Sequence, residues 1–480
     1  MDTTVPTREG TTTMLGSELV DRLRARLRGT LLTPESAEYD RARAVWNAMH
    51  DRHPGLIARC AGAADVIAAV NFAREHRIAL AVRGGGHNIA GSGVCDGGLV
   101  IDLSAMRSVR VDPVAATVRA EPGCTLGDVD RETQAFGLAV PFGINSTTGI
   151  AGLTLGGGFG WLSRRHGLTI DNLVSADVVT ADGILRRASE ADDADLFWAI
   201  RGGGGNYGVV TSFEFRAHPM GPEIYSGLVL YPLDDAPAVL RFYRDFAATA
   251  PDELTCWFVL RQAPPAPFVP PEWRGREVLA LAMCWSNSDS MADGERATLP
   301  LRTIGAPIVD LVGPRPYLEW QAFLDASATP GARNYWKSHD VHELSDELID
   351  LLVRTARTLP DPETDIAVAH MGGATGRVAE DATAYARRDA AYAVLVHGRW
   401  RDPAKDDACV GWTRELFDAT RPYATGRVYV NFMSQDEDDR VAAAYGANHE
   451  RLVALKTRYD PTNLFRTNQN IRPLGEVREP

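Results

Sequence analysis

An α+β fold in two parts, dividing near residue 220, is predicted for this chain. Up to Pro219 the sequence alternates short strand-like apolar runs and helical segments with glycine-rich turns. Beyond Pro219, longer apolar or alternating segments are separated by helical ones, which predicts an antiparallel sheet backed by helices. The first glycine-rich loop also joins a strand to a strand. A Rossmann dinucleotide loop would instead open into a helix, so that fold is disfavoured.

The first part combines helices with short strands. Residues 1 to about 15 are polar and are expected to form a loose tail. Leucines at helical spacing predict a helix beginning at Ser17. Asp65 is the expected N-cap of the next helix. The remaining predicted elements of this part, in chain order, are helix 65–76, strands 78–82 and 99–103, a hairpin within 107–121, a helix over 125–136 capped at Thr125, and strands 173–180 and 184–188.

The second part alternates strands with helices of about three turns. The predicted strands are 225–230, 255–261, 278–285 and 391–399, and the predicted helices are 236–248, 290–302, 344–358 and 407–419. Pro264 to Pro271 is expected to be an exposed loop.

Composition restricts the function classes. The 480 residues carry a net charge of −13, which argues against a nucleic acid or an anionic membrane as partner. The N-terminal residues lack the apolar run of a secretion signal, and no later run reaches the ~18 apolar residues of a membrane helix. A cytoplasmic protein is expected. The six cysteines lack the spacing of a metal site, so reduced, partly buried thiols and no metal are expected.

Three glycine-rich loops are the most informative motifs. The first, 82–93, holds five glycines and His87; the others are 149–173 and 201–211. Glycines accept positive φ and carry no side chain, so successive backbone N–H groups can face a phosphate. Three such loops predict a long ligand that is held by backbone at several points.

The order of these loops resembles the FAD-binding domain of the vanillyl-alcohol-oxidase and p-cresol-methylhydroxylase (PCMH) superfamily, and within it the berberine-bridge-enzyme-like oxidases. Tyr459 to Pro473 is similar to the ending of bacterial members. The resemblance implies a PCMH-type FAD-binding domain over 1–220, with its core at about 50–219. It further implies a substrate-binding cap over 221–435 and a C-terminal segment, 436–480, that returns to the FAD domain.

The resemblance also implies how FAD is attached. The family's histidine at the position of His87 forms an 8α-histidyl bond, and a neutral imidazole nitrogen can attack an electrophilic methyl carbon. The alternative is a loop histidine that only binds a phosphate. Many relatives have a second, cysteinyl bond in a Gly-x-Cys segment, where this chain has Asn145. A single covalent bond, through His87, is therefore expected.

The other flavin contacts implied by the resemblance come from the loops and the C-terminus. They are Arg83, Gly84, Gly85, Gly86, Asn88 and Ile89 at the pyrophosphate; Gly152, Gly156, Gly157 and Gly160 at the ribityl chain; Asp171, Asn172 and Val209 near the adenosine; and Asn468 and Asn470 at the flavin ring.

Two residues are candidates for moving the substrate proton. Arg427 to Phe432 resembles the family's Tyr-x-Asn strand, which makes Tyr429 the first candidate base, provided that the site lowers its pKa; the alternative is a packed strand tyrosine. Relatives place a glutamate where Arg377 stands, and this leaves His370 as the second candidate. Four further aromatic residues could line a pocket or pack in the core, namely Tyr317, Trp320, Tyr335 and Trp336.

The expected function is that of an FAD-dependent oxidase. It would move a hydride from an alcohol, amine or activated C–H substrate to FAD, and molecular oxygen would become hydrogen peroxide. One alternative is a dehydrogenase that reacts poorly with oxygen. Another is a flavin-binding protein without turnover, which Asn145 and Arg377 leave open. The substrate and the oligomeric state are not predicted.

Overall fold

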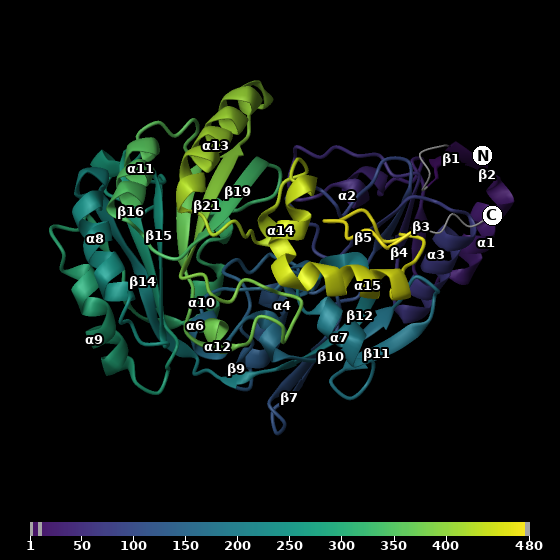
Figure 1. The fold of residues 1–480 in the computed structure, drawn as a ribbon, viewed down its shortest axis with the longest axis horizontal. Helices are drawn as coiled ribbons and strands as arrows, with labels where there is room; N and C mark the ends of the chain where they lie inside the picture. The colour runs from purple at the N-terminus through teal and green to yellow at the C-terminus, as the bar shows by residue number, and fades with distance from the viewer. Residues whose placement is uncertain (1–2, 8–11, 476–480) are drawn as a thin grey trace.

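The structure is a computed structural model that describes residues 3–7 and 12–475, and its elements form two lobes (Figure 1). The first lobe contains a four-stranded sheet with the order β3-β4-β6-β5, in which β6 runs parallel to both β4 and β5. Its elements are β3 (Thr30–Leu32), β4 (Leu56–Arg59), β5 (Leu80–Arg83) and β6 (Leu99–Asp102), with α1 (Ser17–Arg26), α2 (Tyr39–Arg43) and α3 (Ala63–Glu75). The first glycine loop connects β5 to β6, as predicted.

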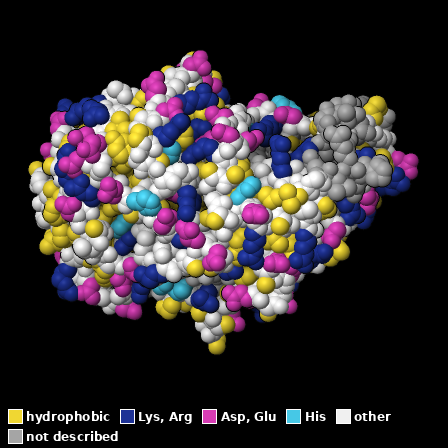
Figure 2. Space-filling view, in the orientation of Figure 1, with side chains coloured by type: hydrophobic (Ala, Val, Ile, Leu, Met, Phe, Trp, Pro, Cys, Tyr) yellow, Lys and Arg dark blue, Asp and Glu magenta, His cyan; other side chains and the backbone are white. Residues whose placement is uncertain are grey.

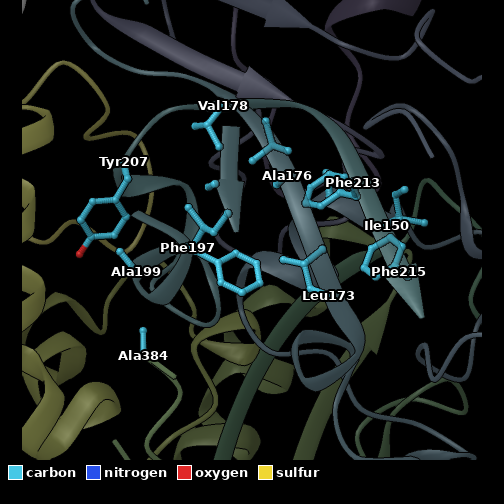
Figure 3. Packing of buried hydrophobic residues seen from close by; sticks show 14 of the residues in the cluster. Ile150, Leu173, Ala176, Val178, Phe197, Ala199, Tyr207, Phe213, Phe215 and Ala384 are labelled. Carbon is cyan, nitrogen blue, oxygen red and sulfur yellow. The ribbon is translucent and has the colours of Figure 1, made fainter. Parts of the chain in front are cut away.

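A second, antiparallel sheet completes the first lobe, with the order β11-β10-β12-β8-β7. Its strands are β7 (Val109–Asp112), β8 (Thr117–Ala120), β10 (Leu173–Val179), β11 (Leu185–Ser189) and β12 (Val209–Arg216). Around it lie α4 (Leu126–Gln134), α5 (Ile150–Leu155), α6 (Ser163–His166), α7 (Ala194–Ile200) and the strand pair β9 (Leu138–Ala139) and β13 (His218–Pro219). Figure 3 shows the aromatic centre of this core, with Phe197 and Phe213 among the labelled side chains.

The second lobe is one large antiparallel sheet, with the order β17-β14-β16-β15-β20-β21-β19 and with β18 on β14. Its strands are β14 (Glu223–Pro232), β15 (Leu254–Gln262), β16 (Glu277–Trp285), β17 (Val309–Asp310), β18 (Gly313–Pro316), β19 (Arg333–Val341), β20 (Asp365–His370) and β21 (Tyr392–Trp400). Its helices are α8 (Ala236–Ala247), α9 (Met291–Arg302), α10 (Tyr317–Ala322), α11 (Asp346–Ala356), α12 (Ala374–Arg377) and α13 (Asp406–Thr420). The sheet backed by helices is thus confirmed.

Period-two alternation gives this sheet two different faces. Side chains such as Phe258 and Leu260 pack against α8, α11 and α13. Their neighbours on β15, such as Trp257, point to the other face and pack with Phe159 and Trp161 of the first lobe. The inner face of the sheet therefore faces the glycine-rich loops of the first lobe.

The C-terminal segment lies on the first lobe, as the yellow ribbon in Figure 1 shows. It includes α14 (Val441–Tyr445) and α15 (His449–Tyr459), and α15 packs against α7. Tyr207 donates to the carbonyl of Leu452, and Lys456 donates to the carbonyl of Asn206. These bonds hold the chain end beside the third glycine loop.

Three local predictions are wrong. In the expected N-terminal tail, β1 (Thr3–Pro6) pairs with β2 (Thr12–Leu15); residues 1–2 and 8–11 lie outside the described residues. Asp65 is not an N-cap: Gly62 holds that position, and the Asp65 carboxylate instead accepts backbone N–H groups of Arg28, Gly29 and Ala61. The segment 427–432 is not a strand but ends in a 3-10 turn, Val430–Phe432.

Charges of both signs are interspersed on the face in Figure 2. The six cysteines are all buried and free. Within the described residues, no helix combines the length and the apolar character that crossing a membrane requires.

Candidate active site

A cavity of about 420 Å³ lies between the two lobes. The first lobe contributes the three glycine loops, and the second lobe contributes the inner face of its sheet. Two further segments complete the wall, 429–432 and 465–469. Elements far apart in the sequence meet in this cavity, so it is the candidate site for the ligand that the glycine loops predict.

The first glycine loop is built to expose its backbone. A side chain at Gly85 would place its Cβ 2.5 Å from the Cα of Gly149, so both loops need glycine where they touch. Gly86 has φ +69°, a left-handed conformation that favours glycine. Within the described chain, the N–H groups of residues 85–88 have no hydrogen-bond acceptor. Four successive unpaired donors form an anion-binding concavity suited to a pyrophosphate.

His87, which belongs to that loop, lies on the wall of this cavity. Its ring stacks on Trp46, with 4.9 Å between centroids, and its Nε2 lies 3.4 Å from the hydroxyl of Thr147. Burial, and then the positive charge of Arg399, lower the pKa of His87 to about 4. The imidazole is therefore neutral at pH 7, the form in which a ring nitrogen is nucleophilic.

Asn145 also lines the cavity, close to His87. Its side-chain oxygen accepts a hydrogen bond of 2.7 Å from Thr147, the residue that approaches His87. The neighbouring Ser146 is held across the lobes, because its backbone N–H donates to Asp325. No cysteine is among the described residues that line the cavity.

The predicted flavin contacts divide into two groups. Those that line the cavity are Arg83, Gly84, Gly85, Gly86, His87, Asn88, Ile89, Gly152, Val209 and Asn468. Those that do not are Gly156, Gly157, Gly160, Asp171, Asn172 and Asn470. The guanidinium of Arg83 is not free for a phosphate, since it donates to Asp102, with one distance of 2.7 Å, and to the carbonyl of Ala42. Arg83 thus lines the cavity while its charge is neutralised elsewhere.

The glycines outside the cavity have a packing role. A Cβ at Gly156 would meet the amide of Asn431, and one at Gly157 would meet the ring of Tyr385. A Cβ at Gly160 would lie 2.3 Å from the carbonyl of Phe142. These positions need glycine because other parts of the chain approach them closely.

The two polar residues near the end of the second glycine loop form hydrogen bonds with other residues of the protein. Asp171 accepts two hydrogen bonds from Arg388, at 2.7 and 2.8 Å. Asn172 donates to the carbonyls of His166 and Leu168, and its side-chain oxygen accepts from Nε2 of His218. Sequence reasoning could not separate such loop-closing bonds from ligand contacts.

Tyr429 lies on the cavity wall. Its phenolic oxygen accepts hydrogen bonds from the Gly158 N–H and the Asn431 amide, both at 2.9 Å. Burial raises the pKa of Tyr429, and this outweighs the lowering by Gly158, Asn431 and the nearby Arg387. The lowered pKa that the sequence argument required is therefore not present.

His370 lies in β20 and is not among the residues that line the cavity. Its Nε2 is 2.9 Å from a guanidinium nitrogen of Arg164. Burial and the charge of Arg164 lower the pKa of His370 to about 3. Arg377 also lies away from the cavity, where it pairs with Asp252. The geometry thus gives neither residue contact with a bound substrate.

Sequence reasoning missed most of the residues that the second lobe contributes. Of the four aromatic candidates only Trp336 lines the cavity, whereas Tyr317, Trp320 and Tyr335 do not. Other lining residues from the inner face of the sheet are Trp257, Val259, Arg261, Ala282, Asp365, Ala367, Leu395, His397 and Arg399. The signal that could have found them is alternation along the strands, combined with a knowledge of strand order.

The residues of the cavity fit FAD. The unpaired N–H groups of residues 85–88 suit its pyrophosphate, and Gly152 has open space where a Cβ would stand. At the C-terminal segment, the side-chain oxygens of Asn468 and Asn470 are buried without a hydrogen-bond partner. A polar ring system with donors and acceptors would satisfy such atoms. Fold and cavity together define a flavoprotein oxidoreductase.

Comparison with known proteins identifies the family. Residues 54–189 match the family model described as FAD binding domain, and residues 428–472 match berberine and berberine like. An FAD-linked oxidoreductase of Dictyostelium discoideum is 31% identical over 95% of this chain and 98% of its own. The chain belongs to the berberine-bridge-enzyme-like family of FAD-linked oxidoreductases, and it is an enzyme of that class.

Two further relatives are oxidases by name. (R)-6-hydroxynicotine oxidase of Paenarthrobacter nicotinovorans is 28% identical, and the match covers 94% of this chain and 98% of that protein. The crystal structure of 6-hydroxy-D-nicotine oxidase from Arthrobacter nicotinovorans superposes with a TM-score of 0.85 at 27% identity, covering 96% of this chain and all of that one. The α+β fold of a PCMH-type oxidase is thereby confirmed.

Proposed function

We propose that this enzyme is an oxidase that carries FAD on His87 alone. The bound flavin would accept a hydride from an alcohol, amine or activated C–H group of a small molecule and pass the electrons to oxygen, giving hydrogen peroxide. The observation that carries the proposal is a neutral His87 on the cavity wall, directly beside four unpaired backbone N–H groups.

The chain's own residues support attachment at one point. His87 offers a neutral ring nitrogen, and its stacking on Trp46 limits the rotation of the ring. Asn145 lies where relatives that resemble this chain carry a cysteine, and an amide cannot form a thioether. The remaining proposed contacts are the cavity-lining members of the predicted set, which include Asn468. To these we add the side-chain oxygen of Asn470, which is buried without a hydrogen-bond partner.

The inner face of the large sheet, where it lines the cavity, favours a substrate with an apolar ring. Trp257 and Val259 of β15 and Leu395 of β21 line the cavity, and their side chains present no polar atom except the indole N–H. A bare sugar would leave several hydroxyls unpaired against such a surface, at a cost of about 1–3 kcal/mol for each. An alcohol or amine on an aromatic or alicyclic ring fits better, and the hydroxynicotine oxidases among the relatives point the same way.

We further propose that Tyr429 contacts the reacting end of the substrate. Its oxygen is fixed by Gly158 and Asn431 and lies on the cavity wall. Because burial raises its pKa, Tyr429 is expected to stay protonated and to position the substrate, not to remove its proton.

The test is anaerobic mixing of the holoenzyme with a panel of cyclic amines, aromatic alcohols, (R)-6-hydroxynicotine and xylobiose, followed by admission of air. We expect a ring amine or alcohol to bleach the flavin absorbance near 450 nm, and air to restore it within seconds with one equivalent of peroxide. Bleaching without rapid recovery in air would indicate a dehydrogenase. No bleaching by any compound would favour a flavin-binding protein without turnover.

A further inference from the structure

A row of three polar residues crosses the inner face of the large sheet beside a row of apolar ones. Arg261 of β15 is the register partner of Asp365 of β20, and Asp365 is the partner of His397 of β21. We call these three residues the polar row. The adjacent row, Val259, Ala367 and Leu395, is apolar and also lines the cavity. The polar row thus lies directly beside an apolar row on the inner face of the sheet.

Within the polar row, Asp365 and His397 form a hydrogen-bonded pair. The Nδ1 of His397 lies 3.0 Å from a carboxylate oxygen of Asp365, and the two side chains are only 19% and 17% exposed. A carboxylate can only accept, so Nδ1 is the donor to Asp365, and in a neutral imidazole held this way Nε2 is the nitrogen with the free lone pair. The Nε2 atom is buried and has no hydrogen-bond partner in the described chain.

A second unpaired nitrogen lies beside this pair. Trp336 of β19 is the register partner of His397, and their ring centroids are 4.3 Å apart. Its indole N–H is also buried without an acceptor. Both residues line the cavity. A buried acceptor and a buried donor, adjacent and unpaired, are a costly arrangement that a bound molecule would relieve.

The position of His397 relative to the proposed flavin site follows from a series of ring contacts. From His87, the rings of Trp46, Trp336 and His397 follow at centroid distances of 4.9, 5.7 and 4.3 Å. From His397, Phe432 is 6.2 Å away and Tyr429 a further 4.8 Å. His397 is therefore connected by ring contacts both to the proposed attachment point and to the tyrosine that we assign to the reacting end, and all three residues line the cavity.

The charged groups around His397 leave the imidazole available. On its own strand, Arg399 is held by Glu363 and Asn334. On β15, the Arg261 guanidinium forms no ion pair within the described residues and lies across the strand from Asp365. Among the residues that the structure describes, Asp365 alone provides a carboxylate bonded to the imidazole. In His397, Nδ1 is thus held by Asp365, whereas Nε2 has no hydrogen-bond partner among the described residues.

We infer that His397, oriented by Asp365, is the group that removes the proton from the substrate's O–H or N–H. As the C–H bond breaks and its hydrogen leaves with both electrons for the flavin, the O–H or N–H bond electrons form the C=O or C=N double bond. The proton from that bond passes to Nε2, and Asp365 stabilises the resulting imidazolium. The bound flavin would be the two-electron oxidant for this step, and Nε2 would receive the one proton that the substrate loses.

This inference rests on the proposed function, but it concerns only the half-reaction without oxygen. Tyr429 and His370, the two candidate bases from the sequence, lack the features of His397. Tyr429 is a phenol whose pKa is raised, and His370 is bonded to a cation outside the cavity. His397 alone of these three combines contact with the cavity, a carboxylate partner and an unpaired nitrogen.

The kinetic test is rapid anaerobic mixing of the holoenzyme with the panel compound that bleaches it fastest, at pH values from 5.5 to 9. For His397→Gln we expect the limiting rate of bleaching to fall about 100-fold or more, while the substrate's dissociation constant changes less than about threefold. A rate that depends on an unprotonated base should fall at acid pH in the wild type, and His397→Gln should lose this dependence. Asp365→Asn should lower the rate at least about 10-fold, and Asp365→Glu should restore part of it.

The matched control is His342→Gln, which removes an exposed histidine just after β19. It should leave the rate and its pH dependence unchanged. If His397→Gln bleaches at the wild-type rate, or keeps the acid-pH fall while Tyr429→Phe loses it, the assignment to His397 is wrong and the phenol is the base.

A second measurement does not need a substrate. In holoenzyme labelled with ¹⁵N-histidine, the signals that disappear in His397→Gln identify this ring. At pH 8 we expect Nε2 to show the shift of an unprotonated nitrogen, and Asp365→Asn to reverse the tautomer. A proton on Nε2 in the wild type would overturn the inference. Should no panel compound bleach the flavin, the proposed function fails, and this tautomer still decides the Asp365–His397 pair.

Discussion

At the scale of single residues, burial decides the chemistry in this cavity. His87 and Tyr429 are both shifted towards their neutral forms, because the cavity wall removes water that would solvate a charge. A neutral imidazole can act as a nucleophile, whereas a neutral phenol is a poor base. The same physical cause therefore supports one of the roles expected from the sequence and weakens the other.

Tyr429→Phe separates these roles experimentally. The change removes an oxygen that accepts from Gly158 and Asn431, which leaves a buried backbone N–H unpaired. We expect the free energy of unfolding to fall by about 1–3 kcal/mol. The limiting rate of anaerobic flavin bleaching should also fall, but its decrease at acid pH should persist. Urea unfolding and stopped-flow absorbance measure the two effects. A rate that no longer depends on pH would assign the proton transfer to Tyr429.

At the scale of elements, the touching glycine loops shape the proposed flavin site. Gly85→Ala would force a Cβ against the backbone of Gly149, which no side-chain rotation can relieve. We expect a loss of at least about 1–3 kcal/mol in stability and less flavin bound per chain, measured by urea unfolding and by the ratio of 450 nm to 280 nm absorbance.

Gly411→Ala is the matched control. It lies inside α13, where an added Cβ meets nothing within 4 Å. This variant should gain up to about 1 kcal/mol from helix propensity and keep its flavin. If Gly85→Ala behaved in the same way, the two loops would not need glycine at their contact.

The sequence predicts an element well when the interactions that form it join residues that are close together in the chain. The hairpin at Val109–Ala120 and the helix capped at Thr125 were predicted correctly because alternation and capping act within a few residues. The segment 427–432 has strand-forming residues but contacts the cavity and turns instead. The polar row could not be predicted, because Arg261, Asp365 and His397 meet only through the register of three strands.

At the scale of the whole molecule, the two lobes meet through buried polar contacts as well as apolar ones. Asp130 of α4 is fully buried and accepts a 3.0 Å hydrogen bond from Gln321 of α10, which also donates to the carbonyl of Gly143 on the cavity wall. Burial raises the pKa of Asp130 to about 7. The contact between the lobes thus contains a carboxyl group that titrates near neutral pH.

This carboxyl predicts a pH effect of definite sign. Between about pH 4 and pH 7 the folded state holds a proton that the unfolded state releases, so the contribution of Asp130 to stability decreases across this range and levels off above pH 7. Asp130→Asn cannot ionise, and its stability relative to the wild type should therefore increase between pH 6 and pH 8. Urea unfolding at the two pH values measures this difference. A relative stability that does not change between these pH values would show that Asp130 is already ionised in the folded protein.

The most direct test of the whole account is the chemistry of His87 in the purified protein. After acid precipitation and tryptic digestion, we expect the flavin to remain on the peptide of residues 84–107, with fragmentation placing it on His87 and not on Cys95. The peptide of residues 132–164, which contains Asn145, should carry none. Release of all the flavin by acid, or a flavin on any residue other than His87, would contradict the account.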